Sequence, residues 1–94
     1  MTIVDKTERT IVERILRSAL ADGCSVRVHD EEDWACDWTD VLGTAMSVMN
    51  NTDIDYVHIR AADGTRIGSV MLVYGNGADV VSDCTVGKVE EYVG

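Results

Sequence analysis

The chain has 94 residues, with 17 acidic and eight basic side chains, which give a formal net charge of −9 at pH 7. This length accommodates one domain, residues 1–94, with one modest hydrophobic core. The charge disfavours direct binding to nucleic acid and to anionic membranes, because their phosphate groups would repel it. Neither a signal peptide nor an apolar run of transmembrane length is evident, so we expect a cytoplasmic protein with no membrane partner.

An amphipathic helix is the first predicted element, between Asp5 and Gly23. Asp5 followed by Glu8 resembles an N-terminal cap, and Gly23 suits the position after a helix. Glu13 and Arg17 form an i, i+4 pair of the favoured orientation. Apolar residues recur at helical spacing and predict a stripe that faces the core: Ile11, Val12, Ile15, Leu16, Ala19 and Leu20.

A strand, an acidic loop and a second helix are predicted next. Residues 24–29 alternate between apolar and polar side chains, as is typical of a half-buried strand. The acidic run at residues 30–33 ends this strand, because like charges repel one another. Asp37 is expected to cap a helix that begins near Trp38. The apolar stripe of this helix and the residues that end it are Val41, Leu42, Ala45, Met46, Met49, Asn50 and Asn51.

Two further strands are predicted in the C-terminal half. Residues 54–61 alternate, and the Asp63-Gly64 pair that follows is a strong hairpin signal. Residues 66–74 are apolar on both faces, as expected of the central strand of a sheet.

The end of the chain predicts a turn, a short strand and a short helix. The turn is at residues 75–77, the strand at Val80-Val81, and the helix within residues 85–93. Three valines are expected to face inward: Val86, Val89 and Val93. The order of elements predicts an α+β fold, a small antiparallel or mixed β-sheet with two to three helices packed on one side.

No motif for catalysis or for cofactor binding is evident, and we expect neither an enzyme nor a cofactor. There is no Gly-x-Ser-x-Gly elbow, and the glycines at residues 75–77 lie between strands, which indicates a hairpin and not a phosphate cradle. The odd cysteine count without a secretion signal favours reduced thiols buried as small hydrophobes. The spacing of the potential metal ligands matches no zinc pattern. Those ligands are Cys24, His29, Cys36, His58 and Cys84.

The distribution of charge is the strongest functional signal. Residues 28–59 contain no Lys or Arg but eight of the 17 acids, so the other nine acids face all eight bases. Such a block steers basic surfaces toward it, the alternative being an acidic face that only confers solubility. Trp34 and Trp38 lie among these acids and can add cation–π contacts, the alternative being packing at the edge of the core. The predicted partner-binding residues are Asp30, Glu31, Glu32, Asp33, Trp34, Asp37, Asp40, Asp53 and Asp55.

Residues 62–77, with the sequence ADGTRIGSVMLVYGNG, and residues 79–83, with DVVSD, resemble small proteins of bacteriophages and other mobile elements. This stretch consists mainly of strand and turn residues, so the resemblance concerns the fold. The whole chain, being short, acidic and single-domain, also resembles phage anti-CRISPR proteins. That second resemblance implies a stoichiometric inhibitor that occupies a nucleic-acid-binding surface of a bacterial CRISPR complex, in the cytoplasm of the bacterial host.

Three hypotheses for the function follow. The first is a non-enzymatic inhibitor, a DNA mimic whose acidic surface blocks a CRISPR complex, as a monomer or a homodimer. The second is an antitoxin, an immunity protein or a modulator of a host factor that uses the same acidic surface on another basic protein. The third, and least favoured, is an enzyme or metal protein built on the cysteines and histidines named above.

Overall fold

The computed structural model describes residues 3–94 and shows an α+β fold, as expected. Five strands form one fully antiparallel sheet in the order β2-β1-β3-β4-β5. In chain order the elements are α1 (Lys6–Ala21), β1 (Ser25–Asp30), β2 (Trp34–Thr39), α2 (Leu42–Ser47), β3 (Ile54–Arg60), β4 (Arg66–Val73), the 3₁₀ turn η1 (Gly77–Asp79), β5 (Val81–Cys84) and α3 (Lys88–Val93).

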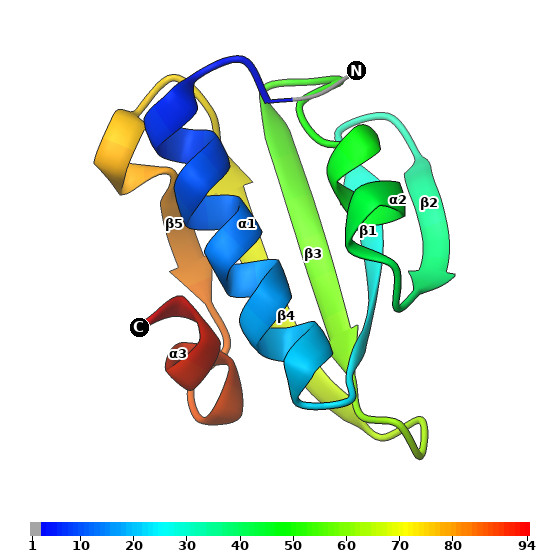
Figure 1. The fold of residues 1–94 in the computed structure, drawn as a ribbon. Coiled ribbons are helices and arrows are strands. Elements are labelled where there is room, and N and C mark those ends of the chain that lie inside the picture. Colours follow the sequence, from blue (N-terminus) through cyan, green and yellow to red (C-terminus); the bar gives the residue numbers. More distant parts are fainter. Residues whose placement is uncertain (1–2) are drawn as a thin grey trace.

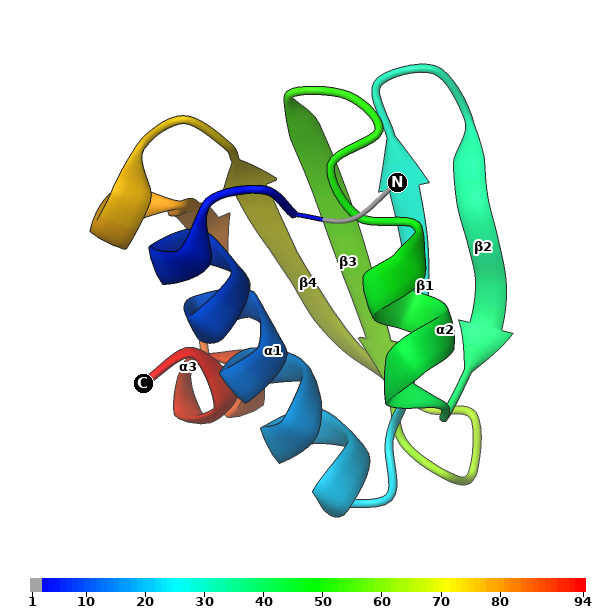
Figure 2. The same ribbon diagram turned by 45° about the horizontal axis from the view of Figure 1, so that its top comes forward.

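All three helices lie on the same side of the sheet (Figures 1 and 2). Helix α1 crosses the middle of the sheet and contacts both α2, which packs near β1 and β2, and α3, which packs near β4 and β5. The other face of the sheet carries no helix, and we call it the open face. The chain therefore has two layers, and one large surface of the sheet stays accessible.

The core lies between α1 and the sheet. Burial alternates along β1 and β3, as the sequence pattern predicts, and the buried positions face the helices. The largest buried side chains from the sheet are Val26, Val28, Val57, Ile59, Val70 and Leu72. The apolar stripe of α1 packs against them, and Val12, Ile15, Leu16 and Ala19 are each at most 2% exposed.

The prediction of a helix beginning near Trp38 was wrong. Residues 34–39 form β2, an edge strand paired with β1, and the helix begins only at Leu42. Asp37 does not cap it: the Asp37 carboxylate accepts a hydrogen bond from Trp38 N at 2.8 Å, within the strand. The β-favouring residues of this segment are stabilised by pairing with β1, and that tertiary contact outweighs the local capping signal.

Three further expectations for the C-terminal half were corrected. The central strand is β3 and not β4, which lies between β3 and the edge strand β5. The short strand was expected at Val80-Val81, but β5 begins at Val81 because the 3₁₀ turn η1 (Gly77–Asp79) with its C-cap Val80 comes directly before it. In the last helix Val89 is fully buried, as expected, but Val86 precedes the helix and is 83% exposed.

Glu8 has a tertiary role that its position in a capping pattern does not reveal. Asp5 caps α1, since its side chain accepts a hydrogen bond from Glu8 N at 2.9 Å. The Glu8 carboxylate points away from this cap, is 2% exposed, and its Oε2 accepts hydrogen bonds from the backbone N–H groups of Gly75, Asn76 and Gly77 at 2.8, 2.9 and 3.0 Å. The turn after β4 is thus an anion-binding nest, and it is occupied by the protein's own carboxylate.

We expect Glu8→Ala to lower the free energy of unfolding by about 2 kcal/mol, because three amides lose a charged acceptor. Urea denaturation measures the change. Glu13→Ala is the matched control on the same helix; it removes only the exposed Glu13–Arg17 pair at 3.4 Å, and we expect a change of about 0.5 kcal/mol or less. Equal effects of the two substitutions would contradict a latching role for Glu8.

Candidate protein-binding surfaces

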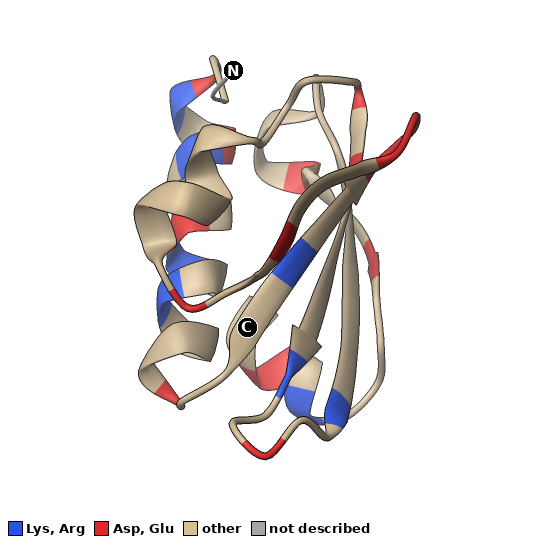
Figure 3. Ribbon diagram, turned by 90° about the vertical axis from the view of Figure 1, so that its right-hand side faces the viewer, with Lys and Arg blue, Asp and Glu red and all other residues tan. Residues whose placement is uncertain are grey.

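Four acidic residues gather at one end of the sheet. Glu31, Glu32 and Asp33 are exposed in the turn between β1 and β2. Glu31 N donates a hydrogen bond to Thr52 Oγ1 at 3.3 Å, which holds this turn beside the segment containing exposed Asp53. We call Glu31, Glu32, Asp33 and Asp53 the acidic tip; the turn is red along its length in Figure 3.

Asp30, which was expected in the partner surface, shapes the tip from inside. Asp30 is only 8% exposed, and its Oδ1 accepts hydrogen bonds from Glu32 N at 2.8 Å and Asp33 N at 2.9 Å. These two backbone hydrogen bonds hold the pKa of the Asp30 carboxyl below its usual value. Asp30 therefore fixes the turn that presents its neighbours and offers little surface to a partner.

Asp55 was also expected at the surface, but it is fully buried on β3, where it meets Asn50 after α2 and Tyr74 after β4. Its Oδ2 accepts hydrogen bonds from Tyr74 Oη at 2.5 Å and from Asn50 N at 2.8 Å, while Oδ1 has no partner among residues 3–94. Burial raises the pKa of the Asp55 carboxyl, and these two hydrogen bonds oppose the rise only in part. Asp55 is therefore a buried residue, and the Tyr74 hydroxyl that it binds also lies 3.7 Å from Met49 Sδ.

Of the two remaining predicted acids, Asp37 lies within β2 and Asp40 follows its end, so neither belongs to the turn that forms the tip. Asp37 Oδ1 lies 3.3 Å from Arg27 Nε, so this exposed carboxylate has a basic neighbour. Asp40 is exposed just beyond the opposite end of β2. The acids of residues 28–59 thus divide into an exposed tip, two structural carboxyls, one ion pair and one distant residue.

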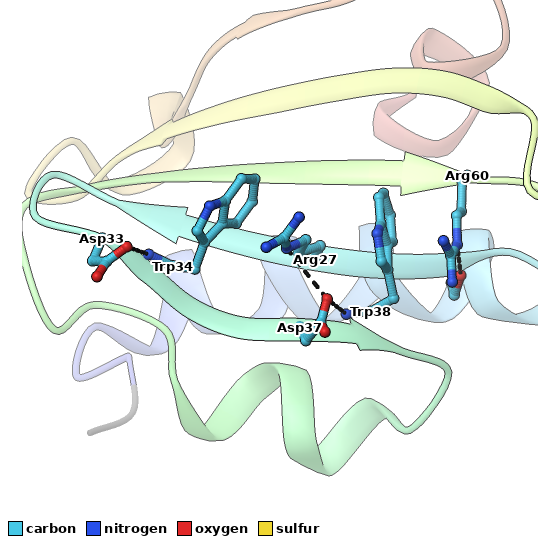
Figure 4. Close-up of polar contacts among 7 residues, drawn as sticks. Arg27, Asp33, Trp34, Asp37, Trp38 and Arg60 are labelled. Atoms are coloured by element: carbon cyan, nitrogen blue, oxygen red, sulfur yellow. Dashed lines mark hydrogen bonds and ion pairs between the residues drawn. The ribbon is translucent and has the colours of Figure 1, made fainter.

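A row of alternating tryptophans and arginines lies on the open face, and sequence analysis did not find it. Arg27 stands 3.5 Å from the centre of the Trp34 ring, and Arg60 stands 4.3 Å from the centre of the Trp38 ring. Figure 4 shows Trp34, Arg27, Trp38 and Arg60 in this order, with their side chains on the same side of the sheet. We call these four residues the Trp–Arg row. Arg66 extends it, 6.0 Å from the Trp38 ring.

Both histidines and Tyr56 continue this aromatic surface toward the middle of the sheet. His29 contacts Trp34 and Tyr56, with ring centres 5.0 and 5.8 Å apart, and His58 lies 5.3 Å from Trp34. Burial, followed by the charge of Arg66, lowers the pKa of His58. Both effects favour the neutral form of the His58 ring.

A shallow hollow of about 280 Å³ adjoins these rings on the side of β4 and β5. It is lined by Tyr56, Ser69, Met71, Asp83, Cys84 and Thr85.

The five potential metal ligands are dispersed through the fold. Cys24 is 3% exposed and its Sγ lies 3.4 Å from Tyr92 Oη, whereas His29 and His58 lie on the open face. Over residues 3–94, no three His, Cys, Asp or Glu side chains converge in a group that could hold a metal ion. All three cysteines are free thiols.

Comparisons with protein-family models, with curated proteins and with solved structures each found no match for this chain. In the part of the chain that the structure describes, no helix is long and apolar enough to span a bilayer.

The raised pKa of Asp55 predicts a pH dependence of stability. Between the ordinary pKa of 3.8 and the raised folded value, the folded state binds more protons than the unfolded state, so Asp55 makes the free energy of unfolding fall as the pH rises through this window. Asp55→Asn keeps an acceptor for Tyr74 and Asn50 and removes the titration. We expect its free energy of unfolding, relative to the wild type, to increase from pH 4 to pH 7 in urea denaturation.

Asp63→Asn is the control, because the pKa of Asp63 is shifted in the opposite direction to that of Asp55. The amide of Thr65 holds the pKa of the Asp63 carboxyl below 3.8, so its contribution is present above that pH and is lost as the pH falls through the lowered value. A pH-independent difference between Asp55→Asn and the wild type would show that Asp55 titrates normally.

Proposed function

We propose that this protein is a non-enzymatic binding domain whose acidic tip engages a cationic surface of a protein partner. One observation carries the proposal: within residues 3–94, no Lys, Arg or His forms an ion pair with Glu31, Glu32, Asp33 or Asp53. Carboxylates without internal partners project a negative field that attracts cations and speeds association.

Four acids outside the tip have basic partners. Lys88 Nζ lies 3.4 Å from both Asp22 and Glu91, while Glu13 pairs with Arg17 and Asp37 with Arg27. Exposed acids without an ion pair among residues 3–94 also lie elsewhere, at Asp5, Asp40, Asp63, Asp79, Asp83 and Glu90, but the tip differs in placing three of them in one turn.

Trp34 directly follows the acidic turn and supplies apolar area for an interface. It is 44% exposed, more than is usual for a tryptophan, and its backbone N–H is fixed by the Asp33 carboxylate at 2.7 Å. A rigid aromatic residue beside unpaired charges is a common centre of binding energy in protein interfaces. The tip and Trp34 together form the proposed contact surface.

The more specific proposal is an inhibitor of a bacterial CRISPR complex. In this role the carboxylates of the tip occupy lysines and arginines that otherwise bind the phosphates of DNA, and the body of the domain blocks the groove sterically. An antitoxin or immunity protein would use the same tip on a nuclease or toxin, so the two functions differ in the partner and not in the chemistry of the surface.

Neutralising the turn tests the proposal. Glu31→Gln, Glu32→Gln and Asp33→Asn in one variant preserve the shape of the side chains and the acceptor for Trp34 N. We expect this variant to inhibit DNA binding by a purified CRISPR effector complex about 100-fold more weakly than the wild type, because close charge pairs at interfaces are lost. Electrophoretic mobility of the target DNA measures the effect.

The matched control removes three charges elsewhere. Asp40→Asn, Asp63→Asn and Asp79→Asn change exposed residues by the same total charge, and we expect inhibition within threefold of the wild type. If the folded tip variant inhibits as well as the wild type, the tip is not the contact surface. If neither the wild type nor the control inhibits any complex, and an affinity pull-down recovers a single nuclease or toxin, the antitoxin function replaces the inhibitor.

A further inference from the structure

The open face concentrates residue types that are rare in this chain. It carries both tryptophans, both histidines and three of the eight basic residues, Arg27, Arg60 and Arg66. Two acids border this surface: Asp37, which is paired with Arg27, and Asp83, which lines the hollow beside β5. A chain with a net charge of −9 thus presents a locally cationic surface around β1 and β3.

Within the protein, the polar contacts of Arg27 and Arg60 are made through their Nε atoms. Arg27 Nε lies 3.3 Å from Asp37 Oδ1 in an ion pair without a hydrogen bond, and Arg60 Nε donates a hydrogen bond to Ser25 Oγ at 3.1 Å. Among residues 3–94, no acceptor hydrogen-bonds the terminal Nη groups of Arg27, Arg60 or Arg66. The guanidinium planes are fixed against tryptophan rings, and their outer N–H groups are left for an external acceptor.

The geometry of the Trp–Arg row favours a polypeptide over a nucleic acid as the ligand of the open face. The guanidiniums of Arg27 and Arg60 already cover faces of Trp34 and Trp38, so these faces are not free to stack on nucleotide bases. The net negative charge of the molecule would also repel a polyanion, whereas it repels a segment with only two carboxylates much less.

The spacing of the arginines indicates what such a segment looks like. Ser25 pairs with Arg60 across β1 and β3, so Arg27 and Arg60 are diagonal neighbours about 7–8 Å apart. In an extended chain, side chains two residues apart point the same way and lie about 7 Å apart. Two carboxylates separated by one residue therefore repeat the backbone spacing of the two arginines.

We propose that the open face binds an extended segment of a partner protein that carries two acidic side chains separated by one residue. The carboxylates meet the outer edges of Arg27 and of the Arg60–Arg66 pair, and the apolar parts of the segment lie against the edges of Trp34 and Trp38. This surface adjoins the acidic tip at Trp34, but its contacts through the arginines do not depend on the function proposed for the tip.

A titration monitored by nuclear magnetic resonance tests the proposal with the full chain. The probe is an acetylated and amidated Leu-Glu-Val-Glu-Leu peptide, and the indole N–H signals of Trp34 and Trp38, the only tryptophans, report on the row itself. We expect both signals to shift with the peptide. A peptide of the same composition with adjacent glutamates, Leu-Glu-Glu-Val-Leu, should bind at least about threefold more weakly, because its carboxylates point to opposite sides.

Two variants with identical charge changes locate the contact. Arg66→Glu, at an exposed position, should weaken binding about tenfold, as expected for the loss of a charge-assisted hydrogen bond. Arg9→Glu, on the exposed side of α1, should change it less than twofold. The unperturbed signals of each variant confirm its fold before titration.

The following results would overturn the proposal. One is the absence of indole shifts at millimolar peptide, and another is equal weakening by the two substitutions. Tighter binding of an oligothymidylate than of the peptide would make the face a nucleic-acid surface. Indole shifts that grow with protein concentration alone, and that vanish on neutralising Glu31, Glu32 and Asp33, would identify the occupant as the acidic tip of a second copy.

Discussion

The antiparallel pairing of β2 with β1 determines where most of the chemistry of this chain lies. The pairing is irregular: Val26 is opposite Thr39, Val28 opposite Cys36 and His29 opposite Trp34, so β2 uses six residues where β1 uses four. Each irregularity inserts one residue and changes the side to which the following residues point. As a result Ala35 and Cys36 pack on the core while Trp34 and Trp38 both reach the open face.

This pairing also separates the charges of opposite sign. The hairpin connecting β1 and β2 carries Glu31, Glu32 and Asp33 beyond the end of the sheet, whereas Arg27 and Arg60 stand on its face. The stacking of guanidinium on indole is worth about 1 kcal/mol per pair and it orients the arginines without neutralising them. A molecule of strongly negative total charge therefore keeps one cationic face, next to its most acidic end.

Local patterns in the sequence predict most of the helical layer and the alternating strands. The stripe of α1 and the alternation of β1 and β3 are set by short-range periodicity and were confirmed. The sites depend on contacts between distant segments, which periodicity does not encode. Glu8 meets a turn 67 residues later, and Asp55 is buried by Tyr74, so neither carboxyl could be assigned from its neighbours in sequence. Trp38 beside Asp37 gave a false capping signal because the pairing partner of β2 was not known.

A binding surface with two signs of charge selects a partner more strictly than a uniform acidic surface does. A purely acidic face attracts any cationic surface in many orientations, because the attraction depends little on how the two surfaces are oriented. Here Trp34 lies at the junction, following Asp33 of the tip in sequence and contacting Arg27 of the row. A partner that covered both proposed surfaces would have to present cations toward the tip and acceptors toward the arginines, and reversing its orientation would place like charges together. For such a partner the junction at Trp34 would fix the direction of docking, through the edge-strand pairing that places Trp34 there.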